Sequence, residues 1–197
     1  MNILIEPVRP EDIPVASAML GRAYVTSPLN VAVFGENLRP NEALMGFLLE
    51  FVTSRQFYIA RESGQIVGAM GMAEWPNCQQ SPSEAPMPPA LLKEFRGSRL
   101  RMKKWSQAWA ERDPKEHHWH FGPFGVLPEK QRQGIGSRLL TYFCEHIDRL
   151  GAAAYLETDK PENLQLYQRF DFTVTAEAPV LGVPNWFMWR SPRKSRL

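Results

Sequence analysis

Apolar residues recur at steps of three and four positions in several stretches of the chain, as they do on the buried face of an α-helix. The most regular stretch covers residues 139–150, and Gly151 follows it as a stop signal. A longer stretch, residues 91–109, contains Gly97-Ser98, where we expect a bend. The pattern predicts helices over residues 13–23, 40–51, 91–109, 139–150 and 161–170.

Shorter runs of alternating or continuous apolar residues lie between these helices and predict β-strands. Ser63-Gly64 separates two of the runs and is typical of a hairpin turn. Near the end of the longest run, Gly122-Pro123 and Gly125 interrupt the pattern, so we expect irregular pairing there. The predicted strands are residues 3–8, 57–60, 65–72, 117–126, 153–158, 172–176 and 186–189.

The order of these elements mixes hairpins with crossover helices: β-α-α-β-β, an insertion, then β-α-β-α-β-β. Such an order predicts an α+β fold in which a mixed sheet lies between helical layers, a three-layer α/β/α arrangement. The 197 residues suffice for one domain, so we expect a single domain over residues 1–197. Residues 75–116, a proline-rich loop followed by a helix, form the predicted insertion.

Composition and charge exclude several functional classes. An apolar fraction of 44% with 22% charged residues is typical of a folded globular protein. The net charge of +2 is too small to indicate nucleic-acid binding, and we interpret the basic run from Lys93 to Lys104 as the solvated face of a helix. The sequence has no apolar run of membrane-spanning length and no signal-peptide pattern, and Cys78 and Cys144 lack paired spacing. We therefore expect a cytoplasmic protein with reduced cysteines.

A glycine-containing loop lies between the strand that is predicted up to Val126 and the helix that follows it. The first amides of a helix have no partner inside the helix, and the helix dipole adds partial positive charge, so a phosphate binds well there. Gly134 and Gly136 would let a phosphate approach the backbone closely. Ser137-Arg138 does not fit a Walker loop, and Leu139 does not fit the third position of a dinucleotide fingerprint. The alternative is a glycine turn that only starts the helix.

Two stretches together resemble the signature of the GNAT acetyltransferases. The first is Val126-Leu127-Pro128 followed by Gln131, Gly134 and Gly136, and the second is Tyr155-Leu156-Glu157-Thr158, Asn163 and residues 166–172. Within this family, residues 90–189 are most similar to the puromycin N-acetyltransferase group. The resemblance implies a mixed, mostly antiparallel sheet of about seven strands that splays apart between its fourth and fifth strands. Asp171 stands where the family usually has glycine. If that position needs a positive φ, aspartate tolerates it better than most residues, at some cost.

The same resemblance implies acetyl-CoA as the cosubstrate and assigns residues to its binding. The amides of the glycine loop would hold the pyrophosphate, and the main chain of the strand before it would pair with the pantetheine arm like an added strand. Asn163 would bond to the same arm. The implied cofactor-binding residues are Phe124, Gly125, Val126, Gln131, Arg132, Gln133, Gly134, Ile135, Gly136, Ser137, Asn163 and Tyr167.

For catalysis, the resemblance aligns Tyr167 with the family's general acid, which protonates the departing thiolate of CoA. A tyrosine hydroxyl is neutral at about pH 7 and can still donate a proton to a thiolate. A buried carboxylate is costly without a partner or a role, so Glu157 on a predicted strand is the favoured general base. His118 and His120 are the alternatives, and each of these residues could instead be an ordinary part of the core.

The histidines near residue 118 raise the question of a metal site. Neighbouring strand residues point to opposite faces, so His118 and His120 share one face while Trp119 and Phe121 share the other. Two histidines alone make an incomplete metal site. We therefore expect no metal.

The expected activity is transfer of the acetyl group of acetyl-CoA to a primary amine of a small molecule, such as an antibiotic or an aminonucleoside, by direct attack. Aromatic residues between Trp75 and Trp119 could wall a compact pocket for that amine. The alternatives are a peptide or protein N-acetyltransferase and a non-catalytic acyl-CoA-binding module. We expect neither nucleic acid nor a membrane as a partner, and both a monomer and a homodimer fit the sequence.

Overall fold

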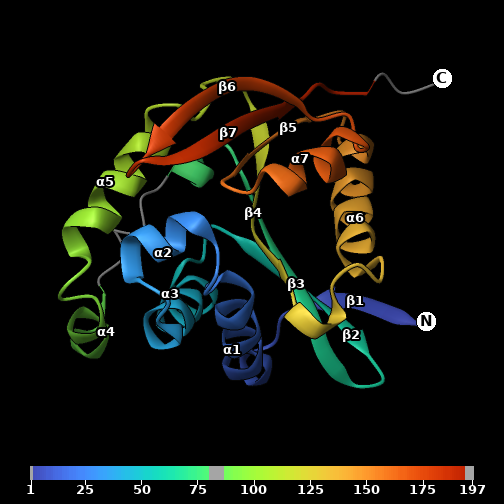
Figure 1. The fold of residues 1–197 in the computed structure, drawn as a ribbon. Helices are drawn as coiled ribbons and strands as arrows, with labels where there is room; N and C mark the ends of the chain where they lie inside the picture. The colour runs from blue at the N-terminus through green and yellow to red at the C-terminus, as the bar shows by residue number, and fades with distance from the viewer. Residues whose placement is uncertain (1, 80–86, 194–197) are drawn as a thin grey trace.

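The computed structural model describes residues 2–79 and 87–193, and in them one sheet of seven strands lies among helices (Figure 1). The strand order is β1-β2-β3-β4-β5-β7-β6. The strands are β1 (Ile3–Pro7), β2 (Gln56–Glu62), β3 (Gln65–Glu74), β4 (His118–Val126), β5 (Ala153–Thr158), β6 (Thr173–Val180) and β7 (Val183–Arg190).

Helices cover both faces of the β3–β4 part of the sheet. α1 packs against α3 and lies on one side of these strands, whereas α6 lies on the opposite side (Figure 1). The helices are α1 (Ile13–Tyr24), α2 (Pro28–Phe34), α3 (Leu38–Phe51), α4 (Pro89–Glu94), α5 (Arg99–Ala110), α6 (Ile135–Arg149) and α7 (Pro161–Gln168), with 3-10 helices η1 (Pro10–Asp12), η2 (Asn77–Gln79) and η3 (Pro128–Lys130). This arrangement confirms the predicted α+β fold with a helical layer on each face. Within the described ranges, each helix is too short or too polar to cross a membrane.

The sheet is mixed, and it opens in its middle. All neighbouring strands are antiparallel except β4 and β5, which are parallel. These two pair only where His118–His120 lies beside Ala153–Tyr155. β4 then continues to Val126 and β5 to Thr158, with no further pairing between them among the described residues. The opening between the fourth and fifth strands, which the family resemblance implied, is therefore confirmed.

α6 supplies the centre of the main hydrophobic core. Its side chains Leu139, Leu140, Phe143 and Ile147 are 0% exposed, at the helical spacing that the sequence pattern indicates. The ring of Phe143 lies 4.7 Å from the ring of Phe121 on β4. Burying each such side chain contributes about 1.5–3 kcal/mol, so this face holds α6 firmly against the sheet. The N-terminus of α6 is thereby held beside the end of β4.

A second, smaller hydrophobic cluster lies at the other end of the sheet. It consists of Leu29 from α2, Tyr155 from β5, Val180 from β6 and Phe187 from β7. Trp105 and Trp109 of α5 pack against this cluster with their rings edge to face and 5.1 Å apart. The cluster therefore holds α2 and α5 beside the strands that lie beyond the opening of the sheet.

The structure corrects several predicted boundaries. α2 is absent from the prediction, although Ser27-Pro28 is a good helix start because proline is favoured in the first turn. The helix predicted over residues 91–109 is two helices, and the expected bend at Gly97-Ser98 is a complete break between α4 and α5. β6 and β7 are longer than predicted. Residues 80–86 of the proline-rich stretch lie outside the described residues, and the status of residues 75–116 as an insertion stays a prediction.

Candidate active site

The N-terminus of α6 presents a run of free backbone amides. The amide of Arg138 donates a hydrogen bond of 3.0 Å to the carbonyl of Gly134. Among the described residues, none accepts a hydrogen bond from the six amides before it, residues 132–137. Free amides and the positive end of a helix dipole together make a site for an anionic group such as a phosphate.

The loop before α6 has an unusual backbone conformation that suits this role. Gly134, directly before the helix, has a φ of 81°, and Arg132 has a φ of 59°. A left-handed conformation costs a non-glycine residue about 1–2 kcal/mol, so the chain accepts a cost at Arg132 to form this loop. A methyl group on Gly134 would meet nothing within 4 Å, so open space faces the loop at this residue.

Phe124 on β4 connects the loop with a neighbouring pocket. A methyl group added to Gly136 would lie 3.2 Å from the ring of Phe124, so glycine allows this close approach. The same ring lies 6.4 Å from the ring of Tyr167 on α7 and forms part of the pocket lining. The loop and the pocket are therefore adjacent.

The pocket lies where β4 and β5 separate, and residues from both strands line it. Its aromatic walls come from α1, α5, β4 and α7, and two carboxylates, Glu157 and Asp159, face it. The lining residues are Ala23, Tyr24, Ser27, Leu29, Asn30, Trp105, Trp109, Phe124, Glu157, Thr158, Asp159, Lys160, Asn163 and Tyr167. Such a mixture of apolar walls and a few polar groups is typical of a small-molecule site.

Tyr167 is 4% exposed, and its ring also contacts Phe172 at 6.1 Å. Burial, together with nearby Tyr24 and Asp159, raises the pKa of Tyr167 well above the usual value of a tyrosine. The hydroxyl is therefore protonated at neutral pH and available as a donor.

Glu157 of β5 forms a pair with His120 of β4 across the separating strands. The carboxylate Oε2 lies 2.8 Å from Nε2 of His120, and the two side chains are 3% and 10% exposed. The other ring nitrogen of His120, Nδ1, is buried and has no partner among the described residues. His120 thus holds the carboxylate of Glu157 in place, while Glu157 itself reaches the pocket.

The edge of β4 that faces the opening has side chains as its neighbours instead of a strand. The amide of Phe124 donates to the hydroxyl of Tyr24 at 2.9 Å, and the carbonyl of Val126 accepts from the side chain of Gln131 at 3.2 Å. Both partners are side chains that can rotate away. Removal from water raises the pKa of Tyr24 to about 12, and the amide of Phe124 partly offsets this effect.

Arg55, which lies just before β2, is a charged residue of this region that the sequence pattern does not indicate. Its guanidinium donates to the carbonyl of Gly122 at 2.8 Å, at the irregular part of β4. Burial lowers the pKa of Arg55, and electrostatic interaction with the acidic groups of Glu157, Cys78 and Asp113 acts in the opposite direction. No local signal in the sequence connects Arg55 with Glu157, because the two residues are about one hundred positions apart.

Asp159 attaches α2 to the far side of the pocket. Its carboxylate accepts hydrogen bonds from the hydroxyl of Ser27 at 2.8 Å and from the amide of Leu29 at 2.7 Å. The carboxylate therefore lies at the N-terminus of α2, where negative charge is favourable. A helix start at Ser27-Pro28 and an acid directly after a strand were signals from which the sequence could have indicated this wall.

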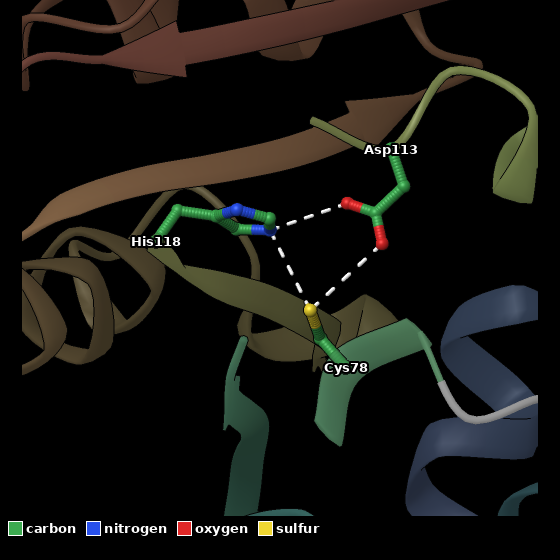
Figure 2. A group of neighbouring side chains, drawn as sticks. All are labelled: Cys78, Asp113 and His118. Carbon is green, nitrogen blue, oxygen red and sulfur yellow. Dashed lines mark hydrogen bonds and ion pairs between the residues drawn. The ribbon is translucent and has the colours of Figure 1, made fainter. Parts of the chain in front are cut away.

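Of the residues that were predicted to act in catalysis, some lie at the pocket and one does not. Tyr167 and Glu157 line the pocket, and His120 bonds to Glu157 behind it. His118 does not line the pocket, because its ring points toward Cys78 and Asp113 (Figure 2). Asn163, predicted to bind the cofactor, is a pocket residue whose side chain lies 3.5 Å from the hydroxyl of Thr158.

Several solved structures share this fold. A chain described as histone acetyltransferase HPA2 and related acetyltransferase, from Corynebacterium glutamicum, is 20% identical with a TM-score of 0.72, over 100% of both chains. A GNAT family acetyltransferase from Brucella melitensis in complex with acetyl-CoA is 18% identical with a TM-score of 0.53, over 96% of this chain and 88% of that chain. The structure of yncA from Salmonella typhimurium with its cofactor acetyl-CoA is 14% identical with a TM-score of 0.59, over 100% of this chain and 99% of that chain. At these identities the similarity establishes the fold.

The sequence itself establishes the family. Residues 33–172 match the profile of the acetyltransferase (GNAT) family, a range that includes the loop before α6, the pocket residues of β5 and α7, and Asp171 with its φ of 66°. These comparisons do not support the narrower likeness to the puromycin N-acetyltransferase group. The chain belongs to the GNAT family of acetyltransferases.

Proposed function

We propose that this protein transfers the acetyl group of acetyl-CoA to a primary amine of a small molecule. The observation that carries the proposal is that Tyr167 and Glu157 line one pocket at the opening of the sheet, beside the free amides of α6. An acid and a base within one site are what direct attack of an amine on a thioester requires.

The residues around the loop fit the polar parts of acetyl-CoA, which supplies an acetyl group activated as a thioester. The amides of residues 132–137 would hold the pyrophosphate, with Gly134 and Gly136 keeping the approach open. The edge of β4 from Phe124 to Val126 would bond to the pantetheine arm once Tyr24 and Gln131 release it. The acetyl-CoA found in the Brucella melitensis and Salmonella typhimurium structures supports this choice of cosubstrate.

Tyr167 would act as the general acid. As the carbon–nitrogen bond forms and the carbon–sulfur bond breaks, its hydroxyl donates a proton to the departing sulfur. The raised pKa of Tyr167 keeps that proton in place until the thiolate develops. Asn163, which also lies on α7, is close enough to the same part of the pocket to orient the arm that carries the sulfur.

Glu157 would act as the general base and take the proton that the attacking amine loses. The carboxylate reaches the pocket, and the 2.8 Å contact with His120 orients it. His120 is then a positioning residue. His118 is not part of this proposal, because it points away from the pocket.

The lining of the pocket favours a small cationic amine as the acceptor. The charged lining residues are two carboxylates, Glu157 and Asp159, and one lysine, Lys160, so negative charge prevails and attracts a cation. The aromatic rings of Trp105 and Trp109 can contact a cation through their faces. α2 and α5 close the pocket on the side away from α6, whereas a peptide acceptor would need an open groove.

The test is release of CoA thiol from acetyl-CoA across puromycin, aminoglycosides, polyamines and short peptides. We expect turnover with at least one small amine, and acetyl-CoA alone should raise the Tm. Turnover with peptides only would favour a peptide acetyltransferase. A raised Tm without any turnover would favour an acyl-CoA-binding module, and an unchanged Tm would contradict the cosubstrate.

A further inference from the structure

A second cluster of polar side chains is buried outside the pocket. Cys78 comes from η2, Asp113 from the loop after α5, and His118 from the first position of β4 (Figure 2). Cys78 is 7% exposed, and the side chains of Asp113 and His118 are 6% and 0% exposed. Nε2 of His118 lies 3.2 Å from Oδ1 of Asp113 and 3.5 Å from Sγ of Cys78, and Sγ lies 3.8 Å from the other oxygen of Asp113, Oδ2. One possible ligand atom from each residue lies within 4.8 Å of the other two.

The ring of His118 is oriented for binding a cation. Its Nδ1 lies 2.8 Å from the backbone carbonyl oxygen of Glu116, which can only accept, so Nδ1 carries the proton. In the neutral ring, Nε2 then has a lone pair that faces Cys78 and Asp113. A histidine whose other nitrogen donates to a backbone carbonyl is the usual arrangement of a metal ligand.

The three residues of the cluster include no lysine or arginine, and the cation that acts on them from outside is Arg55. Oδ1 of Asp113 is buried, and among the described residues it has no hydrogen-bond partner despite its proximity to Nε2. Arg55 interacts electrostatically with Cys78 and Asp113 but donates its hydrogen bond to the carbonyl of Gly122. A carboxylate, a nitrogen lone pair and a sulfur that are buried side by side are suitable ligands for a cation, and the guanidinium of Arg55 does not occupy that place because it bonds to Gly122.

We propose that Cys78, Asp113 and His118 bind a zinc ion. Tetrahedral zinc with bonds of about 2.3 Å to sulfur and about 2.0–2.2 Å to nitrogen and oxygen requires ligand atoms that are about 3.3–3.6 Å apart. The two separations from Nε2 of His118, 3.2 Å to Oδ1 of Asp113 and 3.5 Å to Sγ of Cys78, are close to this range. The 3.8 Å between Sγ and the second carboxylate oxygen, Oδ2, is slightly longer. One thiolate and one carboxylate would neutralise the ion, and a water molecule would complete the tetrahedron.

Other chemistries fit the cluster less well. Magnesium and calcium prefer sites made of oxygen ligands, whereas a thiolate with an imidazole favours zinc. A catalytic triad requires its nucleophile and its acid on different nitrogens of the histidine, but Cys78 and Asp113 both face Nε2. Without a metal, burial and the charge of Asp113 raise the pKa of the Cys78 thiol to about 12, so it would be a poor nucleophile.

The position of the site indicates its purpose. Cys78 and Asp113 lie before and after the segment that carries α4 and α5, and His118 begins the strand that leads to the pocket. A zinc ion would fasten both ends of this segment to the sheet. It would thereby hold Trp105 and Trp109, which form a wall of the pocket. Cys78 lies far from Asp113 and His118 in the sequence. The prediction of no metal rested on the residues close to the histidines in sequence, and Cys78 is not among them.

The first experiment measures metal in the full chain, produced without a histidine tag in medium that contains zinc. We expect about one zinc ion per chain, since the cluster supplies one set of ligands. Replacing zinc with cobalt(II) should give the intense charge-transfer absorption of a thiolate–cobalt bond and the visible bands of a tetrahedral ion. Substoichiometric zinc, or a cobalt spectrum without the thiolate band, would overturn the proposal. Neither measurement depends on acetyl transfer, so it stands or fails apart from the proposed function.

The second experiment compares two cysteine variants. Cys78→Ser should lose the bound zinc and the thiolate–cobalt band, and added zinc should no longer raise its Tm. Cys144→Ser is the matched control, because Cys144 is also buried but lies on α6 away from the cluster, and it should keep the zinc of the wild type. Equal zinc content in the two variants would contradict the assignment of Cys78. If Cys78→Ser does not fold, Asp113→Asn tests the same site through its zinc affinity.

Discussion

At the scale of single residues, Tyr167 and Glu157 differ in how the surrounding structure supports them. Glu157 is held by a polar contact with His120 at 2.8 Å, whereas Tyr167 is held by ring contacts with Phe124 and Phe172. The ring contacts place the hydroxyl of Tyr167 at the pocket, where a ligand can supply an acceptor for its proton. This difference suits a fixed base and an acid whose acceptor, the departing sulfur, comes only with the substrate.

Replacing Tyr167 with phenylalanine tests the acid. Tyr167→Phe keeps the ring that packs on Phe124 and Phe172, so we expect stability and acetyl-CoA binding close to those of the wild type. We expect kcat to fall about 10²-fold or more, because general acid catalysis contributes about 10²–10⁴-fold. Steady-state thiol release measures kcat, and the Tm shift by acetyl-CoA measures binding. Tyr142→Phe, on the α6 face beside Tyr58, is the control, and a similar kcat in both variants would remove Tyr167 from the mechanism.

Two variants distinguish the base from its positioning residue. Glu157→Gln keeps the shape of the side chain but cannot take a proton, so kcat/KM should fall about 10²-fold or more. His120→Gln leaves the carboxylate in the pocket and removes only its partner, so its loss should be smaller. Both losses are measured by thiol release under the same conditions. The reverse order, with the larger loss for His120→Gln, would make His120 the base.

The residues of the site could be predicted from the sequence only where they belong to a recognisable motif. Tyr167, Asn163 and Glu157 belong to a recognisable stretch, so their presence at the pocket was predicted. Cys78 and His118 meet across forty positions, and no periodicity in a sequence reports such a contact. Their proximity results from the path of the chain through the sheet.

At the scale of elements, the N-terminus of α6 carries the cofactor proposal. Gly134 permits the left-handed turn that exposes the amides of residues 132–137, and the apolar face of α6 holds this end of the helix beside β4. The position of the free amides therefore depends both on the local backbone conformation of Gly134 and on the packing of α6 against the sheet.

Gly134→Ala tests the anion site at this turn. The backbone φ of 81° makes alanine unfavourable by about 1–2 kcal/mol, and its methyl group would enter the open space where the pyrophosphate is expected. Gly64→Ala is a matched control, because Gly64 has a φ of 85° in the β2–β3 hairpin and equally free surroundings. Urea unfolding should show a similar loss of stability in both variants. Titration with acetyl-CoA should show weaker binding only for Gly134→Ala, and equal affinities would contradict the site.

The sequence predicts the long, regular elements better than the short ones. α6 repeats its apolar residues at a clear helical period, β3 is a long continuous apolar run, and both were predicted. α2 has only 7 residues. It is stabilised by the packing of Leu29 on residues of β5, β6 and β7 and by the hydrogen bond from the amide of Leu29 to Asp159. Short helices depend on tertiary packing more than on propensity, and for that reason periodicity alone did not reveal α2.

At the scale of the whole molecule, the opening of the sheet decides where the site forms. The order of elements predicts a mixed sheet, but only the family resemblance implied where its strands part. Nothing in the periodicity of β4 or β5 shows that their pairing stops after His120 and Tyr155. The local feature of β4 that the sequence does show is the irregular pair Gly122-Pro123, which lies where the register between β3 and β4 shifts.

Asp12 connects three parts of the molecule on the side of the sheet away from the opening. Its carboxylate, 8% exposed, accepts from the amide of Arg9 at 3.2 Å and pairs with Arg61 of β2, which also pairs with Glu6 of β1 at 2.6 Å. β1, β2 and the start of α1 are thereby joined. Burial alone would raise the pKa of Asp12, but the hydrogen bonds from Arg61 and Arg9 are stronger in sum and lower it below 3.8.

This network predicts a specific loss of stability in acid. A carboxylate whose pKa is lowered by folding stabilises the native state above its unfolded pKa, and that stability disappears as the pH falls through the lower, folded pKa. Asp12→Asn should therefore be less stable than the wild type at about pH 7, by about 1–2 kcal/mol, because hydrogen bonds to a charged group are lost. The difference should shrink as the pH falls from about 4 toward about 2, because protonation removes the same charge from the wild type. Urea unfolding across this range measures it, with Glu11→Gln, an exposed neighbour, as the control that should follow the wild type. A difference between wild type and Asp12→Asn that stays constant with pH would show that the charge of Asp12 does not stabilise the fold.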